Sequence, residues 1–249
     1  MSDAFHSIPA ARDTPLFVFG DHASNHIPEE YHNLGLSGDD LTRHIAWDIG
    51  AETVIRHLCE HFGCGGQLAV ISRLVIDLHR DPKARGLIPI SSDGTLIAQN
   101  EILTETERQD RIDRFYTPYH KALGEALDRR HDPLVVSIHS FTPKPDLGDY
   151  RLLDFGLLVK SDQQSAELLC KMSARCDKTF TLKFNQPYSA FDLNYTVDAN
   201  VAPRGLRHLV IEIRQDHIDT TEKACNIAGI LAGWLEPLVN RSRIDIIRP

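Results

Sequence analysis

Two runs of apolar residues in the chain end directly at histidines. Residues 16–20 lead into Asp21 and His22, and residues 134–138 lead into His139. An uninterrupted apolar run is typical of a strand that is buried on both faces, as in a parallel sheet. The residues that follow each histidine favour turns. The pattern therefore predicts that both histidines lie at the carboxyl ends of central strands, where ligands bind in open α/β sheets.

Predicted strands and helices alternate along the chain. We expect strands near residues 16–20, 68–71, 74–79, 134–139, 155–159 and 207–213. We expect helices over 37–62, as one imperfect helix or as two that meet near Gly50; from Thr104 onward, kinked or split at Pro118; over 163–176; and from Asp219 or Thr220 to about 240. This alternation predicts an α/β fold with a mixed, largely parallel sheet flanked by helices.

The domain organisation is expected to be simple. No linker rich in Pro, Gly or Ser divides the chain, so residues 1–249 are predicted to form a single domain. The connection 83–103 is predicted to be irregular, because it is rich in residues that favour turns. A connection of this length inside a compact domain is more often functional than idle.

Composition and charge exclude several classes of protein. The chain of 249 residues is long enough to bury a substantial core, and its net charge of −8 makes a nucleic-acid backbone an improbable partner. It contains no run of about 18 apolar residues, and no basic segment leads into an apolar one at its start, so neither a membrane span nor a signal peptide is expected. The five cysteines are an odd number without zinc-finger spacing, which indicates structural thiols in a reducing compartment such as the cytoplasm.

His22 and His139 are candidate metal ligands. Two histidines at two strand ends favour a shared metal over two structural histidines, although each could instead form only a local hydrogen bond. Asp21 could orient the ring of His22 from a second coordination shell. Asp48 lies beside the apolar stripe of a predicted helix, where a carboxylate is costly unless it is paired or bound to a metal. Two His and one carboxylate around an open position form a known hydrolytic zinc site, and Asp48 could be the third ligand, unless it is merely solvated or salt-bridged.

Three further charged residues complete a possible reaction centre. Glu212 interrupts the apolar run of the last predicted strand, so it needs a partner or a chemical role, such as that of general base. Arg73 and Arg80 flank the predicted strand 74–79 and could grip a carboxylate bidentately. Alternatively, they could pair with Asp77 or Asp81. Together these residues point to metal-assisted hydrolysis of an amide on an amino acid with a free carboxylate.

A set of motifs in a fixed order resembles a known family. The motifs lie at residues 21–25 (DHASN) with 27–28 (IP), 46–51 (AWDIGA), 72–73 (SR) with 77–80 (DLHR), 88–89 (IP) with 92–95 (SDGT), 116–120 (YTPYH), 139–143 (HSFTP) and 211–216 (IEIRQD). Over nearly its whole length the chain resembles the N-formylglutamate amidohydrolases. That family is similar to the zinc carboxypeptidases and other zinc exopeptidases, with a phosphorylase/hydrolase-like α/β fold.

The resemblance implies roles for individual residues. It implies one zinc ion held by His22, Asp48 and His139, with Glu212 as the catalytic residue. Arg80 is expected to bind the substrate carboxylate, with Arg73, His79 and Asn25 also in contact with the substrate.

Two positions depart from the peptidase pattern. His79 replaces the Asn of the peptidases' Asp-Leu-Asn-Arg motif, and Asn25 stands where those enzymes carry an acidic ligand three residues after the first His. Asp48 is therefore expected to supply the acidic ligand.

The resemblance also implies a substrate class. We expect a small N-acyl amino acid with a free carboxylate, such as N-formylglutamate, to be hydrolysed to formate and the free amino acid, a reaction of histidine degradation. A carboxypeptidase-like deacylase or peptidase for larger substrates is the alternative enzyme. A non-catalytic descendant that binds a metal or a carboxylate is the alternative of a different class.

Overall fold

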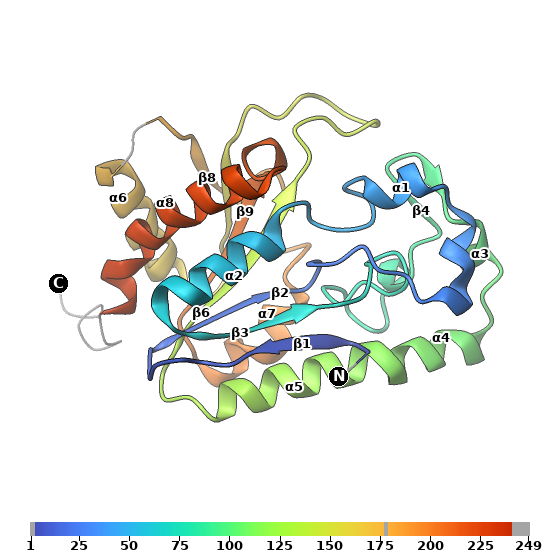
Figure 1. Cartoon of the computed structure of the whole chain (residues 1–249), viewed down its shortest axis with the longest axis horizontal. Coiled ribbons are helices and arrows are strands. Elements are labelled where there is room, and N and C mark those ends of the chain that lie inside the picture. Colours follow the sequence, from blue (N-terminus) through green and yellow to red (C-terminus); the bar gives the residue numbers. More distant parts are fainter. Residues whose placement is uncertain (1–2, 177–178, 241–249) are drawn as a thin grey trace.

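A seven-stranded sheet forms the centre of the molecule. The computed structural model describes residues 3–176 and 179–240. The strands follow the order β1-β3-β2-β6-β9-β7-β8 across the sheet (Figure 1). Their bounds are Phe5–Ile8 (β1), Leu16–Gly20 (β2), Gly65–Ala69 (β3), Leu134–Phe141 (β6), Phe155–Leu158 (β7), Leu182–Phe184 (β8) and His208–Arg214 (β9).

Most neighbouring strands of this sheet run parallel. The pairs β3–β2, β2–β6, β6–β9 and β7–β8 are parallel, whereas β1–β3 and β7–β9 are antiparallel. Helices cover both faces of the sheet. The predicted α/β class, with a mixed and largely parallel sheet flanked by helices, is thus confirmed.

Two helical layers cover the sheet. Helices α2 (Ala51–Phe62), α6 (Gln163–Cys176) and α8 (Thr221–Val239) pack on one face, and α5 (Thr117–Asp128) and α7 (Tyr195–Asn200) pack on the other (Figure 1). Successive strand residues point to opposite faces, so Leu16 and Val18 join the first core, whereas Phe17 and Phe19 join the second. Among the described residues, no helix combines the length and apolarity that a membrane crossing requires.

The predicted helix over 37–62 forms as two helices. Helix α1 (Gly38–Thr42) begins at a capping box formed by Ser37 and Asp40, and α2 begins after Gly50. Gly50 has φ = +80°, and a Cβ atom added there would lie 2.0 Å from the carbonyl oxygen of Ile218. Only glycine fits this position, which explains why the apolar register shifts here.

The long helix expected after Thr104 forms without a break, but part of it is π-helical. Thr104 and Glu107 form the predicted capping box at the start of α4 (Glu105–Arg111). A π-helical turn (Ile112–Tyr116) then joins α4 to α5, with Pro118 in the first turn of α5. Pro118 is the second residue after the π-helical turn and the helix continues past it, so the predicted split does not occur, and the interruption of the α-helix is the π-helical turn. A short α3 (Ala98–Glu101) precedes this unit.

The prediction of a strand over 74–79 is wrong. The preceding strand, expected at 68–71, spans Gly65–Ala69, and residues 70–80 form a loop without strand pairing. Ser72 holds this loop, because its Oγ accepts the N–H of Leu74 and its carbonyl accepts the N–H of Val75. Leu74, Val75, Ile76 and Leu78 are nevertheless buried in the second core. A buried loop and a buried strand leave the same apolar pattern, which explains the error.

Other elements were not predicted. The edge strands β1 and β8 are short, with alternating or exposed residues, and carry little apolar signal. A small hairpin, β4 (Ser91–Ser92) with β5 (Thr95–Leu96), lies within the connection 83–103 that was expected to be irregular. The remaining predicted strands, β2, β6, β7 and β9, and the helices α6 and α8 lie where they were expected to within a few residues, and Thr220, not Asp219, caps α8.

Candidate active site

The candidate site lies at the carboxyl edge of the central parallel strands. His22 is the second residue after β2, and His139 and Glu212 lie in β6 and β9. His139 and Glu212 are register partners across the β6–β9 pair. The apolar residues that build these three strands therefore bring the three polar side chains to one edge of the sheet.

His22, Asp48 and His139 converge as predicted. Each offers one possible ligand atom, and the three atoms lie within 4.8 Å of one another. Asp48 Oδ2 is 2.8 Å from His139 Nδ1 and 3.4 Å from His22 Nδ1. All three side chains are buried. Asp48 lies in the loop before α2 rather than on a helix, and its N–H donates to the carbonyl of His22, which fixes the two residues together.

Buried polar atoms without partners mark the same site. His22 Nε2 donates to Asp77 Oδ1 at 2.7 Å, whereas His22 Nδ1 has no hydrogen-bond partner. Such an arrangement leaves one imidazole nitrogen available as a ligand and uses a carboxylate to orient the ring from the other side. The donor set of two imidazoles and one carboxylate therefore fits a divalent metal such as zinc.

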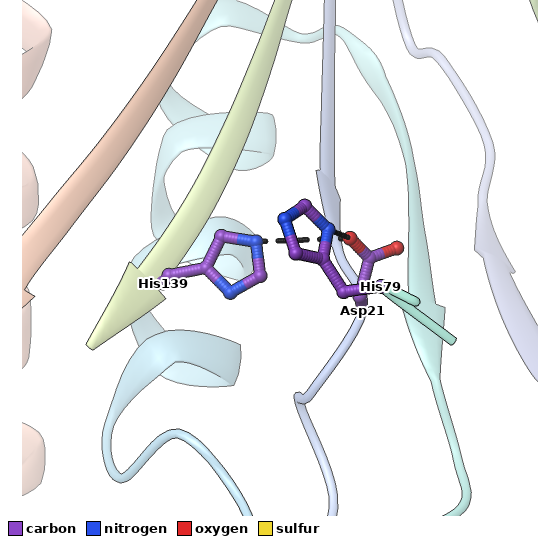
Figure 2. Close-up of side chains that lie close together, drawn as sticks. All are labelled: Asp21, His79 and His139. Atoms are coloured by element: carbon purple, nitrogen blue, oxygen red, sulfur yellow. Dashed lines mark hydrogen bonds and ion pairs between the residues drawn. The ribbon is translucent and has the colours of Figure 1, made fainter. Parts of the chain in front are cut away.

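A second group of residues surrounds Asp21. His79 Nδ1 lies 2.8 Å from Asp21 Oδ2, Tyr119 donates its hydroxyl proton to Oδ1 at 2.7 Å, and His139 Nε2 is 3.7 Å from Oδ2. Figure 2 shows the rings of His79 and His139 next to each other beside this carboxylate, with centroids 4.7 Å apart. Asp21, His79 and His139 could also hold a metal ion, so His139 belongs to two possible ligand sets.

The hydrogen bonds favour the set that contains His22. Asp21 already accepts protons from two fixed donors, and it is the carboxylate nearest to the unpartnered Nε2 of His139. Asp21 therefore has the geometry of an outer acceptor that orients the ring of His79. The sequence predicts such a role for Asp21 toward His22, but in the structure Asp21 orients His79, and Asp77 orients His22.

The charges in the site shift several pKa values. Burial disfavours the charged forms of the three aspartates. The neighbouring histidines nevertheless hold the pKa values of Asp21 and Asp48 below their usual range. His22 and Arg73 lower the pKa of Asp77 in the same way. Burial and Arg73 oppose protonation of His22, yet Asp77 and Asp48 outweigh them and raise its pKa to about 9.

The pKa of Glu212 is raised, whereas the pKa values of the three aspartates are lowered. Burial, together with the negative charge of Asp48, raises its pKa to about 8, although Arg73, His22 and Arg151 act against the shift. Its Oε2 is buried and has no hydrogen-bond partner. A carboxyl group with such a pKa can accept and return a proton near neutral pH.

The two predicted arginines differ in their partners. Arg73 lies 3.3 Å from Asp48 Oδ1 and 3.1 Å from Asp77 Oδ2, so it links both carboxylates. Arg80 is 3.6 Å from Asp77 through Nε, and its side chain is 36% exposed. The alternative pairing with Asp77 is therefore present, most fully for Arg73. Arg80 has more of its guanidinium available for a ligand.

A cavity of ≈380 Å³ opens over these residues. Its lining includes most of the predicted site residues but not Asn25, whose side-chain amide donates to the carbonyl of Leu41 at 2.8 Å. This bond ties the loop after β2 to α1, so the geometry lends no support to contact between Asn25 and a substrate. The lining residues are His22, His44, Asp48, Arg73, His79, Arg80, Ser92, Asp93, His139, Ser140, Phe141, Thr142, Pro145, Leu147, Arg151, Tyr188, Leu193 and Glu212.

Sequence reasoning missed several residues around the cavity. Asp77 was considered only as a partner for the arginines, although it also orients His22. Its position in the Asp-Leu-His-Arg motif was the available signal. The sequence analysis assigned no individual role to Tyr119, whose hydroxyl donates to Asp21. Arg151 lies in an irregular loop between β6 and β7, where no periodicity marks it.

Comparisons with known proteins agree with the family resemblance found in the sequence. The family model of the N-formylglutamate amidohydrolases matches residues 14–218. The fold is similar to that of a gene product from Agrobacterium tumefaciens, with a TM-score of 0.90, 33% identity and coverage of 94% of each chain. It is also similar to an N-formylglutamate amidohydrolase from Ralstonia eutropha JMP134, with a TM-score of 0.68, 22% identity and coverage of 95% of this chain and 97% of that one. No curated protein matches the chain.

Proposed function

Because this chain belongs to the N-formylglutamate amidohydrolase family, we propose that it hydrolyses the amide of N-formyl or other small N-acyl amino acids with the help of one zinc ion. The products would be formate, or another small acid, and the free amino acid. One observation carries the proposal. The carboxyl group of Glu212, whose buried Oε2 has no hydrogen-bond partner, lines the same cavity as His22, Asp48, His139 and Arg80.

His22, Asp48 and His139 would hold the metal. The buried Nδ1 of His22, which has no partner, supports this assignment, and so does the orientation of the ring by Asp77. When bound, a divalent metal acts as a Lewis acid that polarises the scissile carbonyl and lowers the pKa of a water molecule.

Glu212 would serve as the general base. It takes a proton from the attacking water and returns it to the departing amine nitrogen. A pKa of about 8 suits both transfers, because the carboxyl group gains and loses a proton with little cost near neutral pH. The position of Glu212 beside His139 in the sheet keeps the base next to the reacting group.

The cavity supports a small substrate. Arg80 would bind the substrate carboxylate, and Arg73 would contribute mainly by holding Asp48 and Asp77 in place. His79 lines the cavity with its ring fixed by Asp21. A volume of ≈380 Å³ lies near the lower end of the range for ligand pockets, about 300–1,000 Å³, which favours a small acyl amino acid over a peptide.

The proposal is tested by measuring formate release. The purified protein is stripped with a chelator, reloaded with zinc, and assayed with N-formylglutamate. We expect formate to appear only after the metal is restored. If the zinc-loaded, folded protein releases no formate from any member of a panel of N-formyl amino acids, the proposed function is wrong.

A further inference from the structure

The turn of the β4–β5 hairpin holds Asp93 beside the cavity. Asp93 and Gly94 are the two residues between the paired strands, and their φ values are +41° and +78°. Positive φ at both positions is typical of the type I′ turn, which an Asp-Gly pair favours. This turn fixes the Asp93 carboxylate at a position where it lines the cavity together with Ser92.

The Asp93 carboxylate binds a loop from a distant part of the chain. Its Oδ2 accepts the N–H of Asp146 at 2.8 Å, and its Oδ1 accepts the N–H of Leu147 at 3.0 Å. His44 Nε2 lies 3.0 Å from the same Oδ2. Hydrogen bonds to an ionised carboxylate are stronger than those between neutral groups. Although burial alone would raise it, these contacts hold the pKa of Asp93 below its usual value, so the carboxylate stays charged and keeps both N–H groups.

The loop that Asp93 binds has closed ends and an exposed tip. Between β6 and β7, the N–H of Arg151 donates to the carbonyl of Pro143 at 2.7 Å, which brings the two ends of the loop together. Residues 146–150, which lie between these ends, are exposed. A segment with so few buried contacts depends on its polar contacts for its position. We call residues 144–150 the rim loop.

The hairpin and the rim loop meet at the cavity. Ser92 and Asp93 line the cavity from the hairpin, and Pro145 and Leu147 line it from the rim loop. Figure 1 shows the yellow-green segment between β6 and β7 extending away from the sheet toward α1 and β4. The bonds from Asp93 to the rim loop therefore join two walls of the cavity that the sheet does not hold together.

Arg43 adds a second connection from the end of α1. Its guanidinium donates to Asp146 Oδ2 at 2.5 Å and to Thr95 Oγ1 at 2.8 Å, so it also joins the rim loop to the hairpin. The Asp146 side chain is 67% exposed, and an ion pair in such a position contributes little. The side chain of Asp93 is only 11% exposed, so its hydrogen bonds form the stronger connection.

We propose that Asp93 determines the size of the substrate that the enzyme accepts, because it holds the rim loop against the hairpin and so closes this side of the cavity. The inference rests on the proposed function and adds a size limit to its substrate class. Asp93 is a positioning residue, since it acts through the rim loop and not on the reacting atoms. With the contact formed, the cavity of ≈380 Å³ takes a small N-acyl amino acid. With the contact broken, the rim loop can move away and admit a longer acyl group or a peptide.

The test compares substrates of different length in the wild type and in Asp93→Asn. Asparagine also accepts the positive φ of this turn, so the hairpin is preserved. Its amide keeps one acceptor oxygen, but its NH₂ group cannot accept the second N–H. N-Hexanoylglutamate extends N-formylglutamate at the acyl end, and N-formylglutamyl-alanine extends it at the carboxyl end. For Asp93→Asn we expect kcat/KM for at least one of these longer substrates, relative to that for N-formylglutamate, to rise about tenfold, the size expected for a lost hydrogen bond to a charged group.

Hydrogen exchange provides a readout that does not depend on activity. In the wild type the N–H groups of Asp146 and Leu147 are bonded to Asp93, so a peptide that covers the rim loop should exchange slowly at these two positions. In Asp93→Asn the same peptide should exchange about tenfold faster there, while peptides from β6 and β9 stay protected. The measurement is made on both the zinc-loaded and the metal-free protein.

Two further variants separate the role of Asp93 from a general effect of charge. Arg43→Gln should shift the length preference in the same direction by a smaller factor. Asp149→Asn is the matched control, because Asp149 is exposed in the same loop but does not line the cavity. It makes the same change of charge and should leave both the length preference and the hydrogen exchange unchanged.

The outcomes distinguish this inference from the proposed function. A folded, zinc-loaded wild type that hydrolyses no N-formyl amino acid refutes the proposed function and, with it, the size limit. If the wild type hydrolyses N-formylglutamate and both longer substrates equally well, only the size limit is refuted. Faster exchange in Asp93→Asn with an unchanged length preference makes the contact purely structural and also refutes the inference. Should Asp93→Asn fail to fold, the length preference of Arg43→Gln decides.

Discussion

The Nδ1 atom of His139 lies 2.8 Å from Oδ2 of Asp48, although the two residues are 91 positions apart in the chain. The same carboxylate oxygen is 3.4 Å from His22 Nδ1, and the other oxygen contacts Arg73. Asp48 therefore connects three parts of the fold, because it contacts His22 after β2, His139 in β6 and Arg73 in the loop after β3. Several consequences of this arrangement can be measured.

Replacing Asp48 should remove the metal site. Asp48→Asn keeps the volume of the side chain but removes the negative charge that a divalent ion needs. We expect the zinc content of the folded protein after dialysis to fall at least about tenfold, and activity to fall with it. Elemental analysis and circular dichroism provide the measurements. Asp128→Asn is the control, because that carboxylate pairs with Arg204 away from the cavity. Full zinc content in folded Asp48→Asn would contradict its role as a ligand.

Replacing Glu212 should affect catalysis rather than binding. Glu212→Gln preserves the size of the side chain but cannot accept the proton. We expect the variant to fold, keep its metal and bind substrate almost as before, with kcat reduced by about 10²- to 10⁴-fold. That factor corresponds to about 2.7–5.4 kcal/mol of activation free energy. Steady-state kinetics with a parallel metal analysis checks it. Loss of metal, with normal activity of the loaded fraction, would instead make Glu212 part of the metal site.

Replacing Arg80 should affect substrate binding. Arg80→Lys keeps the positive charge but loses the planar fork that binds a carboxylate bidentately. We expect KM to rise by about tenfold, with a smaller change in kcat. Initial-rate measurements over a range of substrate concentrations test this expectation. An unchanged KM would show that Arg80 serves only as a partner of Asp77.

Metal binding should release a proton from His22. In the metal-free protein the pKa of His22 is raised to about 9, above its ordinary value of 6.5. The protonated ring therefore stabilises the metal-free fold fully below pH 6.5, and this stabilisation is lost as the pH rises through 9. At pH 7.5 the proton must leave before the ring can bind a metal, so zinc affinity should increase between pH 6.5 and 9.

Calorimetry measures this proton release directly. Titration of the metal-free protein with zinc, in buffers of different ionisation enthalpy, gives the number of protons released. We expect about one more proton at pH 7.5 for the wild type than for His22→Gln. Equal release by the two proteins would contradict the assignment of the raised pKa to His22.

The central strands could be predicted because their apolar runs are long and end sharply. Residues 16–20 and 134–138 are buried on both faces, so the histidines that follow them could be assigned to the sheet edge. The same reasoning failed at residues 74–79, where tertiary packing buries a loop that has hydrogen bonds to Ser72 instead of a neighbouring strand.

The candidate site could be predicted only in part. Asp48 was identified through its improbable position among apolar residues, although it lies in a loop and not on a helix. Asp77 was considered as a partner of arginine; the Asp-Leu-His-Arg motif marks the residue, but its contact with His22 spans 55 positions and no local pattern indicates that partner. Arg151 could not be identified as a cavity residue, because it lies in an irregular loop whose path no local pattern indicates.

The antiparallel direction of β7 has a further consequence. Because β7 runs opposite to β9, the loop between β6 and β7 leaves and re-enters the sheet at the same edge. His139 and Glu212 lie in central strands of the sheet, whereas Arg151 lies in the segment between β6 and β7, outside the strands. A change in this loop can therefore alter the lining of the cavity while the cluster at the strand ends stays in place. Grafting the 142–154 segment between relatives is the corresponding engineering route to new substrates.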